Sequence, residues 1–372
     1  MTDDEFNLHT ETGDRSWNCP KCDALALPFY DLDDNHLLLN ALNVKNSLVS
    51  NDISLVPNND IIRFVAECNT IGGNSLNLED EEYFPTQVNS KYYDILQLNS
   101  LKPDKSSSLG LFHVNIASLN LHIDDLRTIL SAINFKFDII GISEHKITKN
   151  QGNSLTNIDI PGYHEFVFQP TETSHGGTGF YLKENLNFIE RNDLAFNSPG
   201  DFETKFIEIK FNKKKDLIIG CLYRHPSSKI PLQEFNQNFL DPVLQKINNE
   251  QKQCILMGDF NIDLLKYDVN DDVSLFYNNL SSVSFTPFIL QPTRLHSKTL
   301  IDNIFFNSLE YESSSGNLLI EISDHLIQFL ILEGYIKERS IPEINIFKRD
   351  FSNFVEDEFK ETIQNLDWLN II

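Results

Sequence analysis

The chain has 372 residues, and its 41% hydrophobic content with 28 phenylalanines is enough for a substantial globular core. A formal charge of −24 argues against a general polyanion binder, because such proteins draw their affinity from Lys and Arg. Residues 109–336 carry 28 Asp and Glu against 18 Lys and Arg, but carboxylates that hold Mg²⁺ would be partly neutralised. The net charge alone therefore does not decide the substrate.

The first segment, residues 1–108, shows no sustained periodicity and is rich in Asn, Asp and Ser, so we expect it to be acidic and largely irregular. Its first five residues are acidic where a signal peptide is basic, and no apolar run reaches the length of a membrane span. Five cysteines suggest no disulfide framework. We expect an intracellular protein, in the nucleus or the cytoplasm, and in the nucleus if it acts on genomic DNA.

Residues 17–22 contain a C-x-x-C knuckle, which is half of a tetrahedral zinc site. Its thiols belong to Cys19 and Cys22. The only nearby residues that could complete the site are His9 and His36, at spacings that match no standard pattern. We therefore expect a remnant without zinc in this chain.

From residue 109 onward, short apolar runs alternate with stretches of helical periodicity. Helices are expected at 124–133 and 232–247, and strands at 109–114, 137–142, 177–181, 206–211, 217–223, 300–306, 318–322 and 326–332, with a further strand that ends at Gly258. The part after Gly258 is expected to be mostly strand. This mixture predicts an α/β fold of sheets with helices packed outside. Residues 336–372 become charged again, with a short amphipathic helix expected at 355–363.

Four of the apolar runs end in polar residues that suit catalysis. These ends carry Asn115, Ser143-Glu144, Gly258-Asp259-Phe260-Asn261 and Ser323-Asp324-His325. In sheet proteins with flanking helices, such ends tend to lie along one edge. Each residue alone also has an ordinary role, as a strand-end cap, a turn residue or an interior histidine. Together they predict one site of carboxylates, amides and an imidazole.

This set suits metal-assisted phosphodiester hydrolysis. Hard oxygen ligands for Mg²⁺, or for Mn²⁺ in its place, are offered by Asn115, Glu144 and Asp324, and no thiolate favours zinc. Asp259 would orient and deprotonate the attacking water, with Asn261 near the developing charge.

An imidazole completes the set. His325 would bind a phosphate oxygen or move a proton, and Asp302 would fix its tautomer and stabilise its charged form.

The ordered motifs of residues 109–335 read N…ISE…GGxG…YRHP…GDFN…LIDNIF…SDH. This order resembles the endonuclease/exonuclease/phosphatase superfamily, and within it the apurinic-type endonuclease domain of LINE-like non-LTR retrotransposon polyproteins. The resemblance implies a four-layered α/β sandwich with a Mg²⁺ site at one edge. The knuckle at 17–22 is similar, more weakly, to the closing part of a PHD-type zinc finger. Residues 336–372 resemble a linker into a reverse transcriptase, of which no motif is present, so we expect a fragment of a mobile-element protein.

The resemblance also implies roles for single residues. It places Asn115 and Glu144 at the metal with Asp324 nearby, and it assigns water activation to Asp259, phosphate contact to Asn261 and transition-state stabilisation to His325 with Asp302. Candidates for DNA contact are Tyr223, Arg224, His225 and Arg294. Two positions depart from the pattern, since Ala117 stands where related elements often have Arg, and His175 stands where apurinic endonucleases have Tyr.

The expected function is therefore a Mg²⁺-dependent endonuclease that nicks one DNA strand, as in retrotransposon target-site cleavage. Two alternatives stay open: a phosphodiesterase or phosphatase of the same fold acting on RNA or an inositol phosphate, and an inactive, transposon-derived binding protein. The expected partner is DNA, with no membrane and no predictable protein partner, and the expected state is a monomer.

Overall fold

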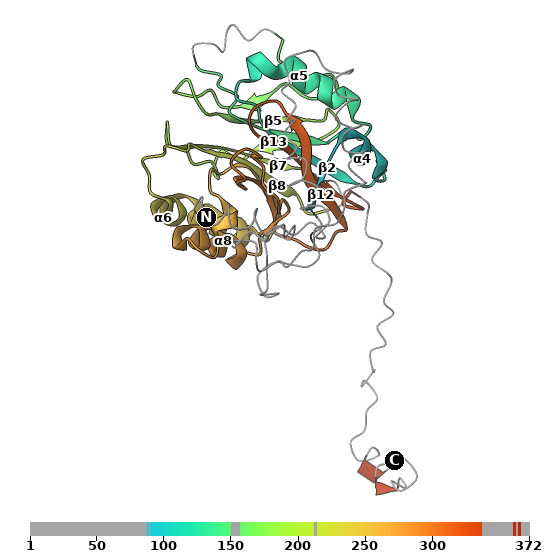
Figure 1. The fold of residues 1–372 in the computed structure, drawn as a ribbon. Helices are drawn as coiled ribbons and strands as arrows, with labels where there is room; N and C mark the ends of the chain where they lie inside the picture. Colours follow the sequence, from blue (N-terminus) through green and yellow to red (C-terminus); the bar gives the residue numbers. More distant parts are fainter. Residues whose placement is uncertain are drawn as a thin grey trace, which may run out of the picture. The chain divides into compact units, whose positions relative to one another are not determined.

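The computed structural model describes residue 88 and residues 90–149, 157–211 and 214–336, together with residues 360, 361, 364 and 365 (Figure 1). The chain divides into two units, residues 1–337 and 338–372. In the second unit, Lys360 and Glu361 are helical, within the stretch where a helix is expected. The cysteine knuckle at 17–22 and most of the tail lie outside the described residues.

The first unit is built on two mixed β-sheets. The first sheet has the strand order β1-β12-β13-β2-β3-β5-β4 and the second has the order β10-β11-β9-β8-β7-β6. The first comprises β1 (Ser90–Tyr93), β2 (Leu109–Asn115), β3 (Ile139–Ser143), β4 (Val167–Phe168), β5 (Thr178–Leu182), β12 (Ser313–Glu321) and β13 (Leu326–Leu332). The second comprises β6 (Phe188–Glu190), β7 (Phe202–Ile209), β8 (Leu217–Arg224), β9 (Gln253–Asp259), β10 (Thr286–Pro287) and β11 (Asp302–Phe306).

Helices cover the outer faces of both sheets. Beside the first sheet lie α4 (Ile95–Ser100) and α5 (Leu119–Ala132), and beside the second lie α6 (Leu232–Phe235), the π-helical η1 (Asn236–Leu240), α7 (Asp241–Glu250), the short η2 (Leu264–Lys266) and α8 (Asp271–Ser282). Figure 1 shows α5 above the first sheet and α6 and α8 below the second, with the sheets between them. The expected four-layered α/β sandwich is therefore confirmed. No helix among the described residues is long and apolar enough to span a bilayer.

Alternation along β2 explains how one strand serves two cores. Leu111 belongs to the core between the sheets, whereas Phe112 and Val114 pack in the core under α5. Because successive side chains of a strand point to opposite faces, His113 and Asn115 share the face of Leu111, toward the second sheet. The polar end of β2 thus lies between the two sheets.

The expected strands are present, but several elements were not expected, and three of them are β1, α4 and α8. β1 and α4 precede residue 109, and β1 forms by parallel pairing with β12, a partner more than 200 residues away. α8 occupies a stretch for which we expect mostly strands. Its helical spacing of buried residues is visible in the sequence, at Val273, Phe276, Tyr277 and Leu280. Asn270 caps it by accepting hydrogen bonds from the backbone of residues 272 and 273.

Candidate active site

The predicted convergence of strand ends is present, and it joins the two sheets. In the first sheet Asn115 at the end of β2 is paired with Ser143 at the end of β3, and in the second Asp259 is paired with Asp302. Asn115 Nδ2 donates to Asp259 Oδ2 at 2.9 Å. One hydrogen bond therefore links the polar ends of both sheets.

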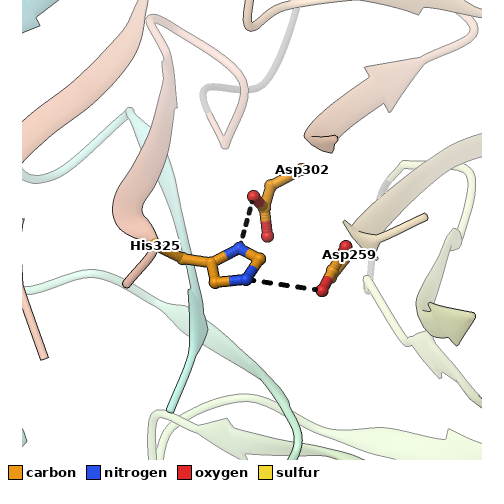
Figure 2. Close-up of side chains that lie close together, drawn as sticks. All are labelled: Asp259, Asp302 and His325. Carbon is orange, nitrogen blue, oxygen red and sulfur yellow. Dashed lines mark hydrogen bonds and ion pairs between the residues drawn. The ribbon is translucent and has the colours of Figure 1, made fainter. Parts of the chain in front are cut away.

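Three buried side chains form the centre of this region, and we call Asp259, Asp302 and His325 the buried triad (Figure 2). His325 Nδ1 lies 2.8 Å from Asp302 Oδ2, and His325 Nε2 lies 3.9 Å from Asp259 Oδ2. Thr293 Oγ1 donates to the same Asp302 oxygen at 2.6 Å. A proton on Nδ1 faces Asp302 in this arrangement, so Nε2 faces Asp259.

Opposing effects separate the pKa values within the buried triad. Burial would lower the pKa of His325, but the charges of Asp302 and Asp259 raise it to about 9. Burial opposes ionisation of Asp302 as well, yet the charge of His325 and its hydrogen bond lower the pKa of Asp302. Burial, followed by the charge of Asp302, raises the pKa of Asp259 to about 7. At neutral pH the His325–Asp302 pair is ionised, and Asp259 is able to gain or lose a proton.

The Gly-Asp-Phe-Asn stretch fixes Asp259 through its local backbone. Gly258 has φ of +151°, and a Cβ there would lie 1.9 Å from the carbonyl oxygen of Leu222 on β8. Asn261 has φ of 50°, in the left-handed region. Its backbone N–H donates to Asp259 Oδ1 at 3.0 Å, and its Nδ2 donates to Oδ2 at 3.1 Å. The residues after the strand therefore hold the carboxyl group in one orientation.

A second carboxylate, Glu144, lies on the other side of Asn115. Asn115 Nδ2 donates to Glu144 Oε1 at 3.1 Å, and Lys146 Nζ is 3.1 Å from Oε2. Burial would raise the pKa of Glu144, but Asn115, Lys146 and the Tyr223 phenol lower it. We call Glu144, Lys146 and Tyr223 the Glu144 side of the site. Its carboxylate is ionised at neutral pH, and 19% of the Glu144 side chain is exposed.

Two places offer ligand atoms for a divalent cation. On the Glu144 side, the ionised and accessible carboxylate is the hard oxygen donor that Mg²⁺ prefers. In the buried triad, one ligand atom from each residue lies within 4.8 Å of the others, and Asp302 Oδ1 is buried without a hydrogen-bond partner among the described residues. The imidazolium of His325 already neutralises Asp302 there, so the Glu144 side fits a cation better.

Asp324, expected beside Asn115 and Glu144, lies next to the buried triad. It is 56% exposed, forms an ion pair with Arg294, and places Oδ1 3.7 Å from His325 Nε2. The structure thus brings Asn115 and Glu144 together and joins Asp324 to Arg294 and His325.

The residues expected to contact substrate have different surroundings. Tyr223 is buried, and the rings of His175 and His225 lie 6.2 Å apart, edge to face, with His175 exposed. Arg224 Nη2 donates to the carbonyl of Ile230, and its guanidinium lies 5.8 Å from the centre of the Phe235 ring. The Arg224 side chain therefore packs against the α6 region, and only its carbonyl, bound by Asn261 Nδ2 at 2.7 Å, reaches the site.

Three residues of the region were missed in the sequence. Lys146 stands two positions after Glu144 and forms an ion pair with it, and this close spacing in the sequence could have indicated the pair. Thr293 supports Asp302 from a loop, and no local signal marks it. Glu203 accepts a hydrogen bond from the backbone of Gly177 at 2.8 Å, and burial, followed by the charge of Glu144, raises its pKa to about 7.

Three solved structures illustrate the chains with a similar course. AP endonuclease LMAP from Leishmania major is 14% identical, with 75% of this chain and 99% of that chain covered and a TM-score of 0.49. A mannosyl-6-phosphatase from Bacteroides thetaiotaomicron is 14% identical (60% and 99% covered, TM-score 0.45), and the human Nocturnin catalytic domain with bound sulfate is 14% identical (63% and 97% covered, TM-score 0.43).

No curated protein matches the chain in sequence. A family model, described as the endonuclease/exonuclease/phosphatase family, matches residues 110–325. This segment is more than half of the chain and includes every residue of the buried triad and Glu144. The chain therefore belongs to the endonuclease/exonuclease/phosphatase family.

Proposed function

We propose that this protein is a Mg²⁺-dependent endonuclease that nicks one strand of DNA, in the manner of target-site cleavage by a non-LTR retrotransposon. The proposal depends on one observation above all. Asp259 is a fully buried carboxyl group with a pKa of about 7, and it is held between His325 and the amide that contacts Glu144. A base with a pKa close to the working pH, beside a carboxylate that stays ionised, suits hydrolysis by an activated water.

In this proposal Asp259 accepts the proton of the attacking water, whose oxygen forms a bond to phosphorus while the bond to the leaving oxygen breaks, and the leaving oxygen takes a proton from solvent. The His325 imidazolium donates from Nε2 to a non-bridging phosphate oxygen, and Asp302 keeps the other ring proton on Nδ1. Asn261 orients the Asp259 carboxyl group and steadies the phosphate.

Glu144 and Asn115, with Asp324 as a further ligand, would hold Mg²⁺, or Mn²⁺ in its place. When bound, the cation supplies Lewis-acid stabilisation of the phosphate charge. Tyr223, His225, His175 and Arg294 are proposed to contact the DNA, whereas Arg224 acts through its carbonyl group. The overall negative charge makes this cation a requirement for phosphate binding as well as for chemistry.

Nicking of supercoiled plasmid tests the proposal. We expect nicked circles with Mg²⁺ or Mn²⁺, none with a chelator, and none with Asp259→Asn or His325→Ala. Asp193→Asn, which removes a carboxylate from the ion pairs around Arg191 near the β6 edge, is the matched control and should nick normally.

Parallel assays separate the alternatives. The same protein is incubated with single-stranded RNA, with an inositol phosphate and with an oligonucleotide that contains one abasic site. Hydrolysis of RNA or inositol phosphate without plasmid nicking would show that DNA is not the substrate, while the proposed phosphoester hydrolysis would stand. DNA binding without hydrolysis of any substrate would reject the enzymatic proposal.

A further inference from the structure

A second buried histidine lies under the site and takes no part in the proposed chemistry. His113 is fully buried on β2, two residues before Asn115, and it points toward the second sheet. Apolar residues such as Leu111, Ile139 and Leu330 line much of this face, together with a few buried polar residues. A buried imidazole in such surroundings costs stability unless its polar atoms are paired.

Both ring nitrogens of His113 are paired. Nδ1 lies 2.7 Å from Gln328 Oε1, and Nε2 lies 2.9 Å from Ser143 Oγ. Gln328 Nε2 donates to the carbonyl of Leu326 at 2.5 Å, which turns Oε1 toward the imidazole. Nδ1 therefore carries the proton and donates to Gln328, and Nε2 accepts from the Ser143 hydroxyl group.

These partners belong to the strands that carry the candidate catalytic residues. His113 shares β2 with Asn115, Ser143 directly precedes Glu144, and Gln328 follows His325 by three residues. Backbone pairing already places His113 opposite Gln328, and Asn115 opposite Ser143. The imidazole adds a side-chain link across β13, β2 and β3, two residues along β2 from Asn115.

Ser143 also lies near the second sheet. Its Oγ is 3.5 Å from the carbonyl oxygen of Leu222, the residue before Tyr223 on β8, but the one hydroxyl proton is donated to His113 Nε2, so the side-chain link stays within the first sheet. A leucine at position 113 would fill the space but would fix no distance between these strands, because apolar contacts are not directional. Paired polar groups fix one arrangement.

We infer that His113 is a positioning residue, which through Gln328 and Ser143 holds Asn115, Glu144 and His325 in the arrangement that the reaction needs. This inference rests on the proposed function for its kinetic consequence. Partners of this kind, which act through a residue at the site, typically change activity by roughly 10–100-fold. The effect belongs to kcat, because the side chain touches neither the cation site nor the substrate surface.

The test compares two substitutions with a matched control. His113→Phe keeps a flat ring but removes both hydrogen bonds, whereas His113→Asn keeps a donor at the place of Nδ1. Tyr335→Phe removes a different, partly buried hydrogen bond, to Gln253 Oε1 at the opposite end of β9 from Asp259. We expect His113→Phe to lower kcat for plasmid nicking by about 10–100-fold with KM changed less than about threefold. His113→Asn should recover most of this loss, and Tyr335→Phe should keep the kcat of the unmodified protein.

A second measurement does not require activity. The proton on His325 Nδ1, which faces Asp302 Oδ2 at 2.8 Å, should give a downfield proton resonance in NMR spectra. We expect this resonance to shift in His113→Phe and to stay in place in Tyr335→Phe. If the wild-type protein does not nick DNA but this shift is observed, the endonuclease proposal is rejected and the positioning role of His113 still holds.

Two results would overturn the inference. One is a His113→Phe protein with a lower melting temperature but unchanged kcat and an unchanged His325 resonance, which is the behaviour of a residue that only stabilises the fold. The other is an equal loss of kcat in Tyr335→Phe. If His113→Phe does not fold, Ser143→Ala removes the Nε2 partner alone, and an unchanged kcat there, together with an unchanged His325 resonance, would reject the inference.

Discussion

The two halves of the candidate site treat negative charge in different ways. In the buried triad, Asp302 and His325 neutralise each other away from solvent. On the Glu144 side, the carboxylate is partly exposed and its cationic partner is Lys146, on a flexible side chain. The charges of the first half are balanced within the fold, and in the proposed function a metal ion would replace the Lys146 partner of the second half. A fixed ion pair, His325 with Asp302, thus lies beside a pair whose cation can exchange, Glu144 with Lys146.

The difference also separates the functions of two carboxyl groups. Burial beside Asp302 raises the pKa of Asp259 to about 7, whereas Asn115, Lys146 and Tyr223 outweigh burial and lower the pKa of Glu144. Two carboxyl groups that both contact Asn115 therefore suit a proton acceptor and a metal ligand. The experiments that follow change one half at a time.

The largest effect is expected from Asp259→Asn, which removes the proposed proton acceptor. Activity should fall by about 10²–10⁴-fold.

The same substitution should raise the thermal stability of the folded protein at alkaline pH. The pKa of Asp259 is about 7 when folded, above its unfolded value near 3.8, so its ionisation costs stability as pH rises between those values. Asp259→Asn should thus melt at a higher temperature than the wild type at pH 8, and the gain should vanish near pH 4. An equal loss of stability at both pH values would contradict this account.

Glu144→Gln changes the other half and keeps the size of the side chain. We expect the Mg²⁺ concentration for half-maximal nicking to rise by about 10–100-fold, because a ligand charge is lost. Activity should recover in part at high Mg²⁺, unlike that of Asp259→Asn. A Mg²⁺ titration of nicking rates measures this difference, and an unchanged titration midpoint would remove Glu144 from the metal site.

Asp302→Asn should move the pH dependence. Asp302 is the main group that raises the pKa of His325 to about 9, so His325 should lose its proton at a lower pH in the variant. The alkaline limb of the profile of kcat/KM against pH, expected near pH 9 in the wild type, should shift down by at least about one unit.

The protonated form of His325 stabilises the fold fully below pH 6.5, and this contribution is lost as pH rises through 9. The loss should be smaller in Asp302→Asn. An unmoved alkaline limb would exclude His325 as the titrating group.

The smallest effect is expected from Lys146→Gln. The ion pair with Glu144 is partly exposed, and such pairs contribute about 0.2–1 kcal/mol. Removing the competing ammonium group should tighten Mg²⁺ binding by no more than about fivefold, with kcat nearly unchanged. Weaker Mg²⁺ binding in this variant would mean that Lys146 supports the metal site rather than competing for it.

The sequence predicts the centre of the site better than its rim. Asn115, Glu144, Asp259, Asp302 and His325 contact one another as a connected set, because each ends or begins a buried strand and the strand order brings those ends together. Strand periodicity is a local property, so it is readable from one sequence.

The rim depends on how loops fold back, which no local pattern encodes. Asp324 follows a strand as expected, yet its exposed side chain pairs with Arg294 from a distant loop. Arg224 stands next to Tyr223, but alternation along β8 turns its side chain toward Phe235. Thr293 reaches Asp302 through the turn of the loop between them, and Glu203 reaches Gly177 from another strand, so neither contact follows from strand periodicity.

The Asn115 carboxamide touches both halves, since its Nδ2 donates to Glu144 and to Asp259. A cation that draws Glu144 toward itself must change the hydrogen bond that Asp259 receives from the same nitrogen. Metal uptake and proton release are then thermodynamically linked, and the linkage is reciprocal. Under the proposed function, the factor by which saturating Mg²⁺ alters the acidity of Asp259 would equal the factor by which ionisation of Asp259 alters Mg²⁺ affinity, so a single amide group would make pH and metal concentration interdependent.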